Sequence, residues 1–156
     1  MKVVRFFSIS VVVSMLGLAV VSAQDAEEKE PTPEEKAVDY RQDVMHVVAA
    51  QRGLMREMAD GKRPTDAAAF SNAAYALAAV ARVIPDAFNK NLMTSYSTAK
   101  PEIWSDMADF TEKSNALADK AGTIAKLAST DIEGAKAMVK DIEECSSCHD
   151  VYRVED

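Results

Sequence analysis

The stretch "TPEEKAVDYRQDVMHVVAAQRGLMREMADG", residues 32–61, has a start, a periodic body and an end. Thr32 stands where an N-cap belongs, Pro33 takes the first helical position, and Glu35 completes a capping box. Gly61 comes where a glycine commonly ends a helix. The stretch therefore predicts one long amphipathic helix. Its apolar stripe falls on positions 37, 40, 44, 47, 48, 51, 54, 55 and 58, all apolar or aromatic except Gln51.

A second helix is expected after a short turn. It begins at Thr65 or Asp66 and runs through "AAAFSNAAYALAAVARV", where many alanines allow close approach to a neighbouring helix. Pro85 is expected to end it, because proline has no backbone N–H and clashes with the preceding turn. A longer connection over residues 86–100 follows.

Two further helices complete the pattern. The third opens with Pro101 in its first turn, and Asp131 caps a fourth that carries apolar residues at three- and four-residue steps as far as Cys145. No segment shows the sustained period-two alternation of a strand. Four amphipathic helices joined by mostly short loops predict an all-α fold, an antiparallel four-helix bundle.

Residues 1–23 are typical of an export signal. Positive charges at Lys2 and Arg5 precede an apolar run over positions 11–21, and small residues lead to a cleavage point after Ala23. A membrane anchor would need about 20 apolar residues, and this run is shorter. Since no twin-arginine pair is present, we expect export by the general secretion route, a periplasmic location and no membrane span after cleavage.

The mature chain divides into two parts. Residues 24–33 are acidic and proline-bearing, which predicts a disordered leader, and residues 34–156 form the bundle domain. Loss of the two positive charges of the signal takes the formal charge from −7 to −9. Such a chain cannot assemble the basic face that nucleic acid needs. Its acidity fits a basic protein partner, and it also serves solubility alone.

Both cysteines of the chain lie in "CSSCHD", residues 145–150. A disulfide between them would close too small a loop to constrain the chain. On a helix, positions i, i+3 and i+4 share a face, so Cys145, Cys148 and His149 point the same way. This arrangement suits attachment of a c-type haem, in which two thiols join the porphyrin and the next imidazole binds the iron.

Three other interpretations of this turn remain open. A thioredoxin-like redox pair needs a preceding strand and a helix N-terminus that lowers the thiol pKa. A structural zinc site needs four ligands, and His46 is the only other cysteine or histidine. A surface disulfide would leave His149 incidental. Export, the helical context and the following histidine together favour haem.

The chain resembles the class II c-type cytochromes, the cytochrome c-prime family, over residues 34–153. The resemblance rests on "DYRQ" (39–42), "DGKRPTDAAAF" (60–70), "KPEIWSDMADF" (100–110) and "CSSCHDVYR" (145–153). A haem motif near the C-terminus is specific to this class. The resemblance implies one covalent haem c per chain, electron transport rather than enzymatic turnover, a redox partner protein, and the homodimer that members often form through their first two helices.

The resemblance also assigns roles near the haem-binding turn. It implies thioether bonds from Cys145 and Cys148 and proximal iron ligation by His149. Arg153 matches a basic residue near the proximal side, and helical spacing would carry it to the face of His149. Arg41 matches an arginine close to the haem propionates. The alternatives are a solvated Arg153 at the helix end and an exposed, ion-paired Arg41.

Two more positions concern the distal side of the haem. Phe88 matches an aromatic residue that packs at the distal pocket. Met45 matches the residue that faces the iron opposite His149, where low-spin members place a methionine ligand and others an apolar blocker. His46, on the face opposite the apolar stripe, is expected to be exposed, and Trp104 is expected in the core with a partner for its N–H.

Three functional hypotheses follow. The leading one is a periplasmic electron carrier with His149 and Met45 as axial ligands of the haem iron. The alternative is a five-coordinate cytochrome c-prime that binds or sequesters nitric oxide. The third is a helical interaction module without haem, which the absence of colour in the purified protein would reveal.

Overall fold

The computed structural model describes residues 29–154, so the predictions for residues 1–28 lie outside the described residues. The described part holds seven helices, and its only β-type pairing is an isolated bridge. None of these helices is long and apolar enough to cross a membrane. They are α1 (Pro33–Ala59), α2 (Ala67–Ala81), α3 (Ile84–Ala87), α4 (Glu102–Ser105), α5 (Met107–Ala128), α6 (Ile132–Lys140) and α7 (Glu144–Tyr152).

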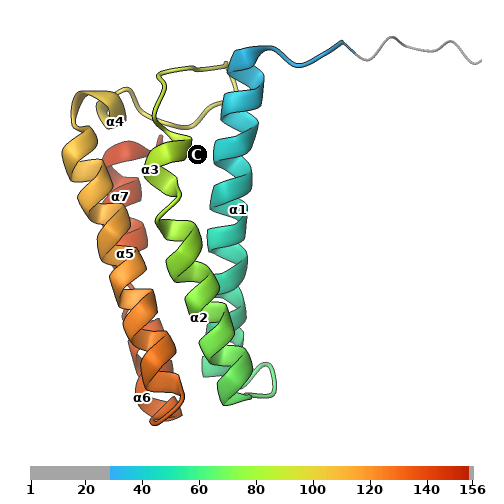
Figure 1. Cartoon of the computed structure of the whole chain (residues 1–156), viewed down its shortest axis with the longest axis vertical. Helices are drawn as coiled ribbons and strands as arrows, with labels where there is room; N and C mark the ends of the chain where they lie inside the picture. Colours follow the sequence, from blue (N-terminus) through green and yellow to red (C-terminus); the bar gives the residue numbers. More distant parts are fainter. Residues whose placement is uncertain (1–28, 155–156) are drawn as a thin grey trace, which may run out of the picture. The chain divides into compact units, whose positions relative to one another are not determined.

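The helices pack as a bundle, which confirms the predicted fold class (Figure 1). The four helical segments of the bundle are α1, α2, α5, and α6 followed by α7 (Figure 1). α2 packs chiefly on α5 and α1, while α6 packs on α5 and α1 and α7 packs on α5. The short helices α3 and α4 lie at the same end of the bundle as α7 (Figure 1).

The ends of α1 are those that the sequence predicts. The Thr32 hydroxyl accepts from the Glu35 amide at 3.2 Å, and the Glu35 carboxylate accepts from the Thr32 amide at 2.7 Å. Together they satisfy two backbone donors that the helix leaves unpaired. Gly61 follows the C-cap with φ 70°, a left-handed conformation that favours glycine.

The buried face of α1 differs from the predicted stripe. Tyr40 and Val47, which the stripe includes, are 49% and 45% exposed. Val38 and Arg41 are buried instead, at 1% and 3% exposure. The cause is tertiary, because α1 packs against α3 and the Arg41 side chain donates to the Ala87 carbonyl at the end of α3.

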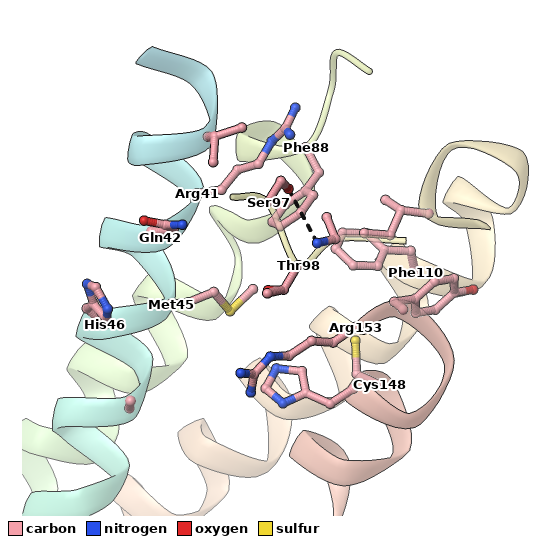
Figure 2. Close-up of a pocket in the computed structure, with 16 residues that line it drawn as sticks. Arg41, Gln42, Met45, His46, Phe88, Ser97, Thr98, Phe110, Cys148 and Arg153 are labelled. Atoms are coloured by element: carbon pink, nitrogen blue, oxygen red, sulfur yellow. Dashed lines mark hydrogen bonds between the residues drawn. The ribbon is translucent and has the colours of Figure 1, made fainter. Parts of the chain in front are cut away.

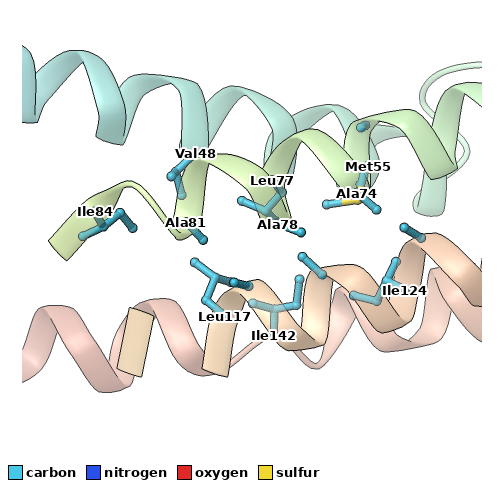
Figure 3. Packing of buried hydrophobic residues seen from close by; sticks show 14 of the residues in the cluster. Val48, Met55, Ala74, Leu77, Ala78, Ala81, Ile84, Leu117, Ile124 and Ile142 are labelled. Atoms are coloured by element: carbon cyan, nitrogen blue, oxygen red, sulfur yellow. The ribbon is translucent and has the colours of Figure 1, made fainter. Parts of the chain in front are cut away.

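The core lies between the α1–α2 pair and the α5–α6 pair (Figure 3). Leu77 of α2 is fully buried on one side of the core. Leu117 and Ile124 of α5 and Ile142 are buried on the other side (Figure 3). Small residues on α2 allow the close approach to α5 that its composition predicts. The buried alanines of α2 are Ala73, Ala74, Ala78 and Ala81.

The predicted end of the second helix is wrong by a few residues. α2 begins after Asp66, whose side chain accepts from the Ala68 amide at 2.9 Å, as the sequence predicts. It ends at Ala81, however, before Pro85. Pro85 lies in the first turn of α3, where a missing N–H does no harm.

The third and fourth helices, each expected to be continuous, are both broken. Asp106, with φ −134° and ψ 60°, separates α4 from α5 and caps α5 by accepting from the Asp109 amide. The break between α6 and α7 places Ile142 in the core at 5% exposure. There the Lys120 ammonium donates to the Asp141 carbonyl at 3.0 Å, which satisfies a group that the helix no longer pairs.

Candidate functional site

Two cavities, of 470 and 290 Å³, open beside α1 and α7. They share the lining residues Met45, Ala49, Cys148 and His149 and therefore adjoin; the two together are termed here the groove. The connection from α3 to α4 contributes to the wall of the larger cavity. All the candidate residues line the larger cavity except Cys145, which lines the smaller one.

The two thiols lie on α7 and are half-buried. Cys148 reaches the larger cavity (Figure 2). Burial raises the pKa of both thiols, that of Cys148 to about 11. A redox-active pair needs the opposite shift, and no strand precedes α7 within residues 29–154. The thioredoxin-like interpretation therefore does not fit, although α7 begins at Glu144 and places Cys145 in a first helical turn.

His149 lines both cavities. Partial desolvation, with the positive charge of Arg153, lowers the pKa of its imidazole. The ring is therefore neutral at neutral pH, the form that binds a metal. The zinc interpretation would need His46 as a fourth ligand. His46 is exposed, as predicted, and lines only the larger cavity, and residues 29–154 hold no cluster of three or more histidine, cysteine or carboxylate side chains that could bind a metal ion.

Met45 reaches the groove from the opposite wall. Its half-buried side chain points from α1 toward Cys148 and Arg153 (Figure 2). Met45 lines both cavities, as His149 does. A thioether on α1 and an imidazole on α7 thus both line the groove.

Arg41 is buried in the wall of the larger cavity, so the exposed alternative for this residue is wrong. Its guanidinium donates to the carbonyls of Ala87 at 3.1 Å, Leu92 at 2.6 Å and Lys90. Burial lowers the pKa of Arg41 from its ordinary value. Since arginine has five N–H donors, these three bonds leave two for another acceptor.

Aromatic rings form a continuous wall beside Arg41. Phe88 lies 6.5 Å from Trp104 and 5.1 Å from Phe110, centroid to centroid. The guanidinium of Arg41 lies 5.0 Å from the Phe88 centroid and 5.1 Å from that of Trp104, within cation–π range. Trp104 is half-buried, and its indole N–H donates to the Phe88 carbonyl at 2.8 Å, which is the kind of partner expected for this N–H.

Tyr152 completes this wall and was missed in the sequence. It is 4% exposed, and its ring meets Phe110 edge-on at 5.2 Å. Its hydroxyl donates to the Asp109 carboxylate at 2.6 Å, which ties α7 to α5. The spacing could have found it, because Tyr152 stands three residues after His149 on the same face of α7.

Arg153 reaches the groove by a different route from the one predicted. It lies beyond the last helical residue, in extended conformation with φ −117° and ψ 137°, so the helical spacing argument is wrong. It still lines the larger cavity. Its backbone pairs with Ala99, which brings Ser97 and Thr98 into the wall. No local signal in the sequence marks this pairing.

The groove is positively charged, which suits a large apolar ring system that carries carboxylate groups. Four cations line it, against the single carboxylate of Glu144, in a chain of formal charge −7. Among residues 29–154, no partner meets the buried Arg52 Nε, which can therefore donate to a bound group. With two thiols and a neutral imidazole, the residues present fit a covalent haem. The four cations are Arg41, Arg52, Lys113 and Arg153.

Comparison with known protein families identifies the family to which this fold and this motif belong. The family model described as Cytochrome C' matches residues 36–153. The chain belongs to the cytochrome c' family. The resemblance read from the sequence is thereby confirmed, and with it the cofactor: this cytochrome c' binds haem c covalently, and its two cysteines suffice for one attachment site.

Several relatives of this cytochrome c' are similar over most of their length. A cytochrome c' of Alcaligenes xylosoxydans xylosoxydans is 33% identical over 76% of this chain and 94% of its own. A cytochrome c-554 of Cereibacter sphaeroides is 32% identical over 86% and 88%. A solved nitric oxide complex of a mutant cytochrome c prime from Alcaligenes xylosoxidans has a TM-score of 0.71 and 31% identity, over 81% of this chain and 100% of that one.

Proposed function

We propose that this cytochrome c' is an exported, periplasmic electron carrier in which His149 and Met45 are the axial ligands of the haem iron. Haem c supplies a one-electron ferric–ferrous couple. The observation that carries the proposal is that both residues line the same two cavities, one from α7 and one from α1. An iron bound on both sides has no open position for a substrate, so we propose no enzymatic turnover.

The remaining candidate residues hold and shield the cofactor. Cys145 and Cys148 form the two thioether bonds from one helix, while the two unused N–H donors of Arg41 donate to a propionate carboxylate. Arg153, at the end of α7, adds positive charge beside His149. The ring of Phe88, 6% exposed, excludes water from the distal side.

The absorption spectra of the oxidised and reduced protein test the ligation. We expect a low-spin ferric spectrum with the weak near-infrared band of methionine-ligated haem. Met45→Ala should remove this band, shift the iron toward high spin and lower the reduction potential, because a thioether favours the ferrous state. Met138→Ala is the matched control, since Met138 is also half-buried against the core but does not line either cavity. A parent protein that is high-spin at neutral pH would refute the ligation.

Nitric oxide binding is the second candidate function. A relative that is 31% identical to this chain was solved as a nitric oxide complex. Met45 lines the larger cavity together with the apolar side chains of Phe88 and Ile103. If Met45 only fills this cavity, the parent is already high-spin, and Met45→Ala merely widens the pocket that receives nitric oxide. If Met45 is a ligand, the parent binds nitric oxide much more slowly than Met45→Ala does.

We also propose two kinds of protein partner. A redox partner with a basic docking surface would suit a chain whose formal charge becomes −9 when the two positive charges of the signal are lost. A homodimer through α1 and α2 is supported by the exposed side chains of Tyr40, Val47 and Tyr75 on these helices. Sedimentation of the parent and of Val47→Glu tests the dimer, because a buried charge at this face would separate the subunits.

A further inference from the structure

The connection between α3 and α4, residues 88–100 and termed here the strap, is bonded to α1 through Lys90, Leu92 and Tyr96. Arg41 of α1 donates to the strap carbonyls of Lys90 and Leu92 and to that of Ala87 just before them. The Tyr96 hydroxyl donates to the Asp39 carboxylate of α1 at 3.1 Å. The strap is thus fixed to the helix that carries Met45.

The second half of the strap is bonded to the end of α7. The Lys100 amide donates to the Tyr152 carbonyl at 2.9 Å, and the Val154 amide donates to the Thr98 carbonyl at 2.8 Å. The Lys100 ammonium adds a bond to the Asp150 carbonyl at 3.2 Å. The strap is thus also fixed to the helix that carries His149.

Direct packing does little to hold these two helices together. α1 packs on α2, α3 and α6, whereas α7 packs on α5 and α4. The groove lies beside both, and the strap forms part of its wall through Ser97, Thr98 and Ala99 (Figure 2). Its bonds therefore connect the two sides of the groove.

We propose that the strap sets the separation between Met45 and His149 and that Arg41 is the positioning residue on the α1 side. The inference rests on the proposed function, because it assigns the strap a role in axial ligation. The wall that carries the Met45 thioether is kept at bonding range only while the strap is tied at both ends. A released strap lets α1 move outward, and the thioether spends more time away from the iron.

Arginine is suited to this position for a geometric reason. The three carbonyls approach one guanidinium from different directions, and its planar fork meets each with a separate nitrogen: Nε, Nη1 and Nη2. A lysine keeps the positive charge for a propionate but presents one nitrogen, which cannot reach all three oxygens in the same geometry. Arg41→Lys therefore separates the positioning role from the charge.

The other end of the strap can be released without touching the groove charges. Val154→Pro removes the N–H that bonds Thr98, and Arg153 already has the extended conformation that a residue before proline adopts. Val154→Ala keeps the N–H and is its control. Arg56→Lys, at an exposed position of α1, is the control for Arg41→Lys. Ser71→Ala controls for general destabilisation, because it removes a 2.8 Å hydrogen bond to Ala125 outside the groove.

The experiment measures three properties of the ferrous and ferric holoprotein. These are amide hydrogen exchange of the strap, the spin state, and the rate of carbon monoxide binding. For Arg41→Lys and Val154→Pro we expect about tenfold faster exchange at Lys100 and about tenfold faster carbon monoxide binding, with a larger high-spin fraction. The three controls should match the parent in all of them.

Four outcomes would contradict the proposed role of the strap. If Arg41→Lys and Val154→Pro speed up amide exchange in the strap but leave the spectrum and the rate of carbon monoxide binding unchanged, the positioning role is wrong. It is also wrong if neither variant changes amide exchange in the strap. A high-spin parent would refute Met45 ligation and, with it, the inference. A low-spin parent whose variants bind carbon monoxide at the parental rate would refute the inference alone.

Discussion

Replacing Tyr152 with phenylalanine isolates one bond between α7 and α5. The ring remains, with its edge-on contact to Phe110 at 5.2 Å, so apolar packing is kept. The hydroxyl bond to Asp109 at 2.6 Å is lost, and bonds to a charged group contribute about 1.5–3 kcal/mol. Asp109 keeps its ion pair with Lys113 at 3.5 Å, so its charge stays paired. We expect a loss of about 2 kcal/mol in the free energy of unfolding, or about 8 °C in Tm for a domain of this size.

Urea and thermal unfolding of the holoprotein, followed by circular dichroism, measure this loss. Burial, together with the hydrogen bond to Asp109, raises the pKa of Tyr152. The folded protein therefore keeps the phenolic proton at a pH where the unfolded chain has lost it. The stabilisation from Tyr152 is complete below about pH 10, the ordinary pKa of tyrosine, and falls as the pH rises above it.

The pH dependence gives a second check on the same substitution. The difference in stability between the parent and Tyr152→Phe should be constant from neutral pH to about pH 9 and should narrow above about pH 10. Tyr75→Phe, at a tyrosine that is 49% exposed on α2, keeps the ring at the proposed dimer face and should leave the pH dependence of stability unchanged. An unchanged unfolding midpoint for Tyr152→Phe, or a difference that widens at high pH, would refute the reasoning.

Two further predictions concern the cofactor and the core. Acid–acetone extraction should leave the haem on the parent polypeptide, whereas Cys145→Ala combined with Cys148→Ala should yield protein without covalent haem; complete extraction from the parent would refute the assignment. Leu77→Ala should lower the free energy of unfolding by about 3 kcal/mol, because the side chain is fully buried and leaves a cavity. A shift in the urea midpoint that corresponds to less than about 1 kcal/mol would show that the core collapses around the gap.

Helix starts could be predicted because their chemistry is local. Thr32, Asp66 and Asp131 each cap a helix with their own side chain, and the residues they bond lie two or three positions further on. Helix breaks could not be predicted in the same way. The break after α6 depends on Lys120, which is distant in sequence and donates to the Asp141 carbonyl.

In the candidate site, too, local features could be predicted from the sequence and long-range contacts could not. The motif of Cys145, Cys148 and His149 is visible from spacing, and these residues line the groove. The strap pairs with residues 152–154 through bonds between backbone amides and carbonyls. These bonds do not depend on the side chains, so the sequence does not reveal them. The burial of Arg41 could not be predicted from the apolar pattern of α1, because it follows from the carbonyls of Ala87, Lys90 and Leu92; only the family resemblance placed this residue near the haem.

The separation of α7 from α6 has a consequence for the order of events during maturation. α7 has nine residues, fewer than the roughly 12–15 that an isolated helix needs to persist in water. It is helical because the bundle holds it, through Lys120 at its start and Asp109 at its end. Until these contacts form, we expect the segment with Cys145, Cys148 and His149 to be largely unfolded, with both thiols accessible. Joining the haem before the bundle closes then requires no unfolding of a finished protein.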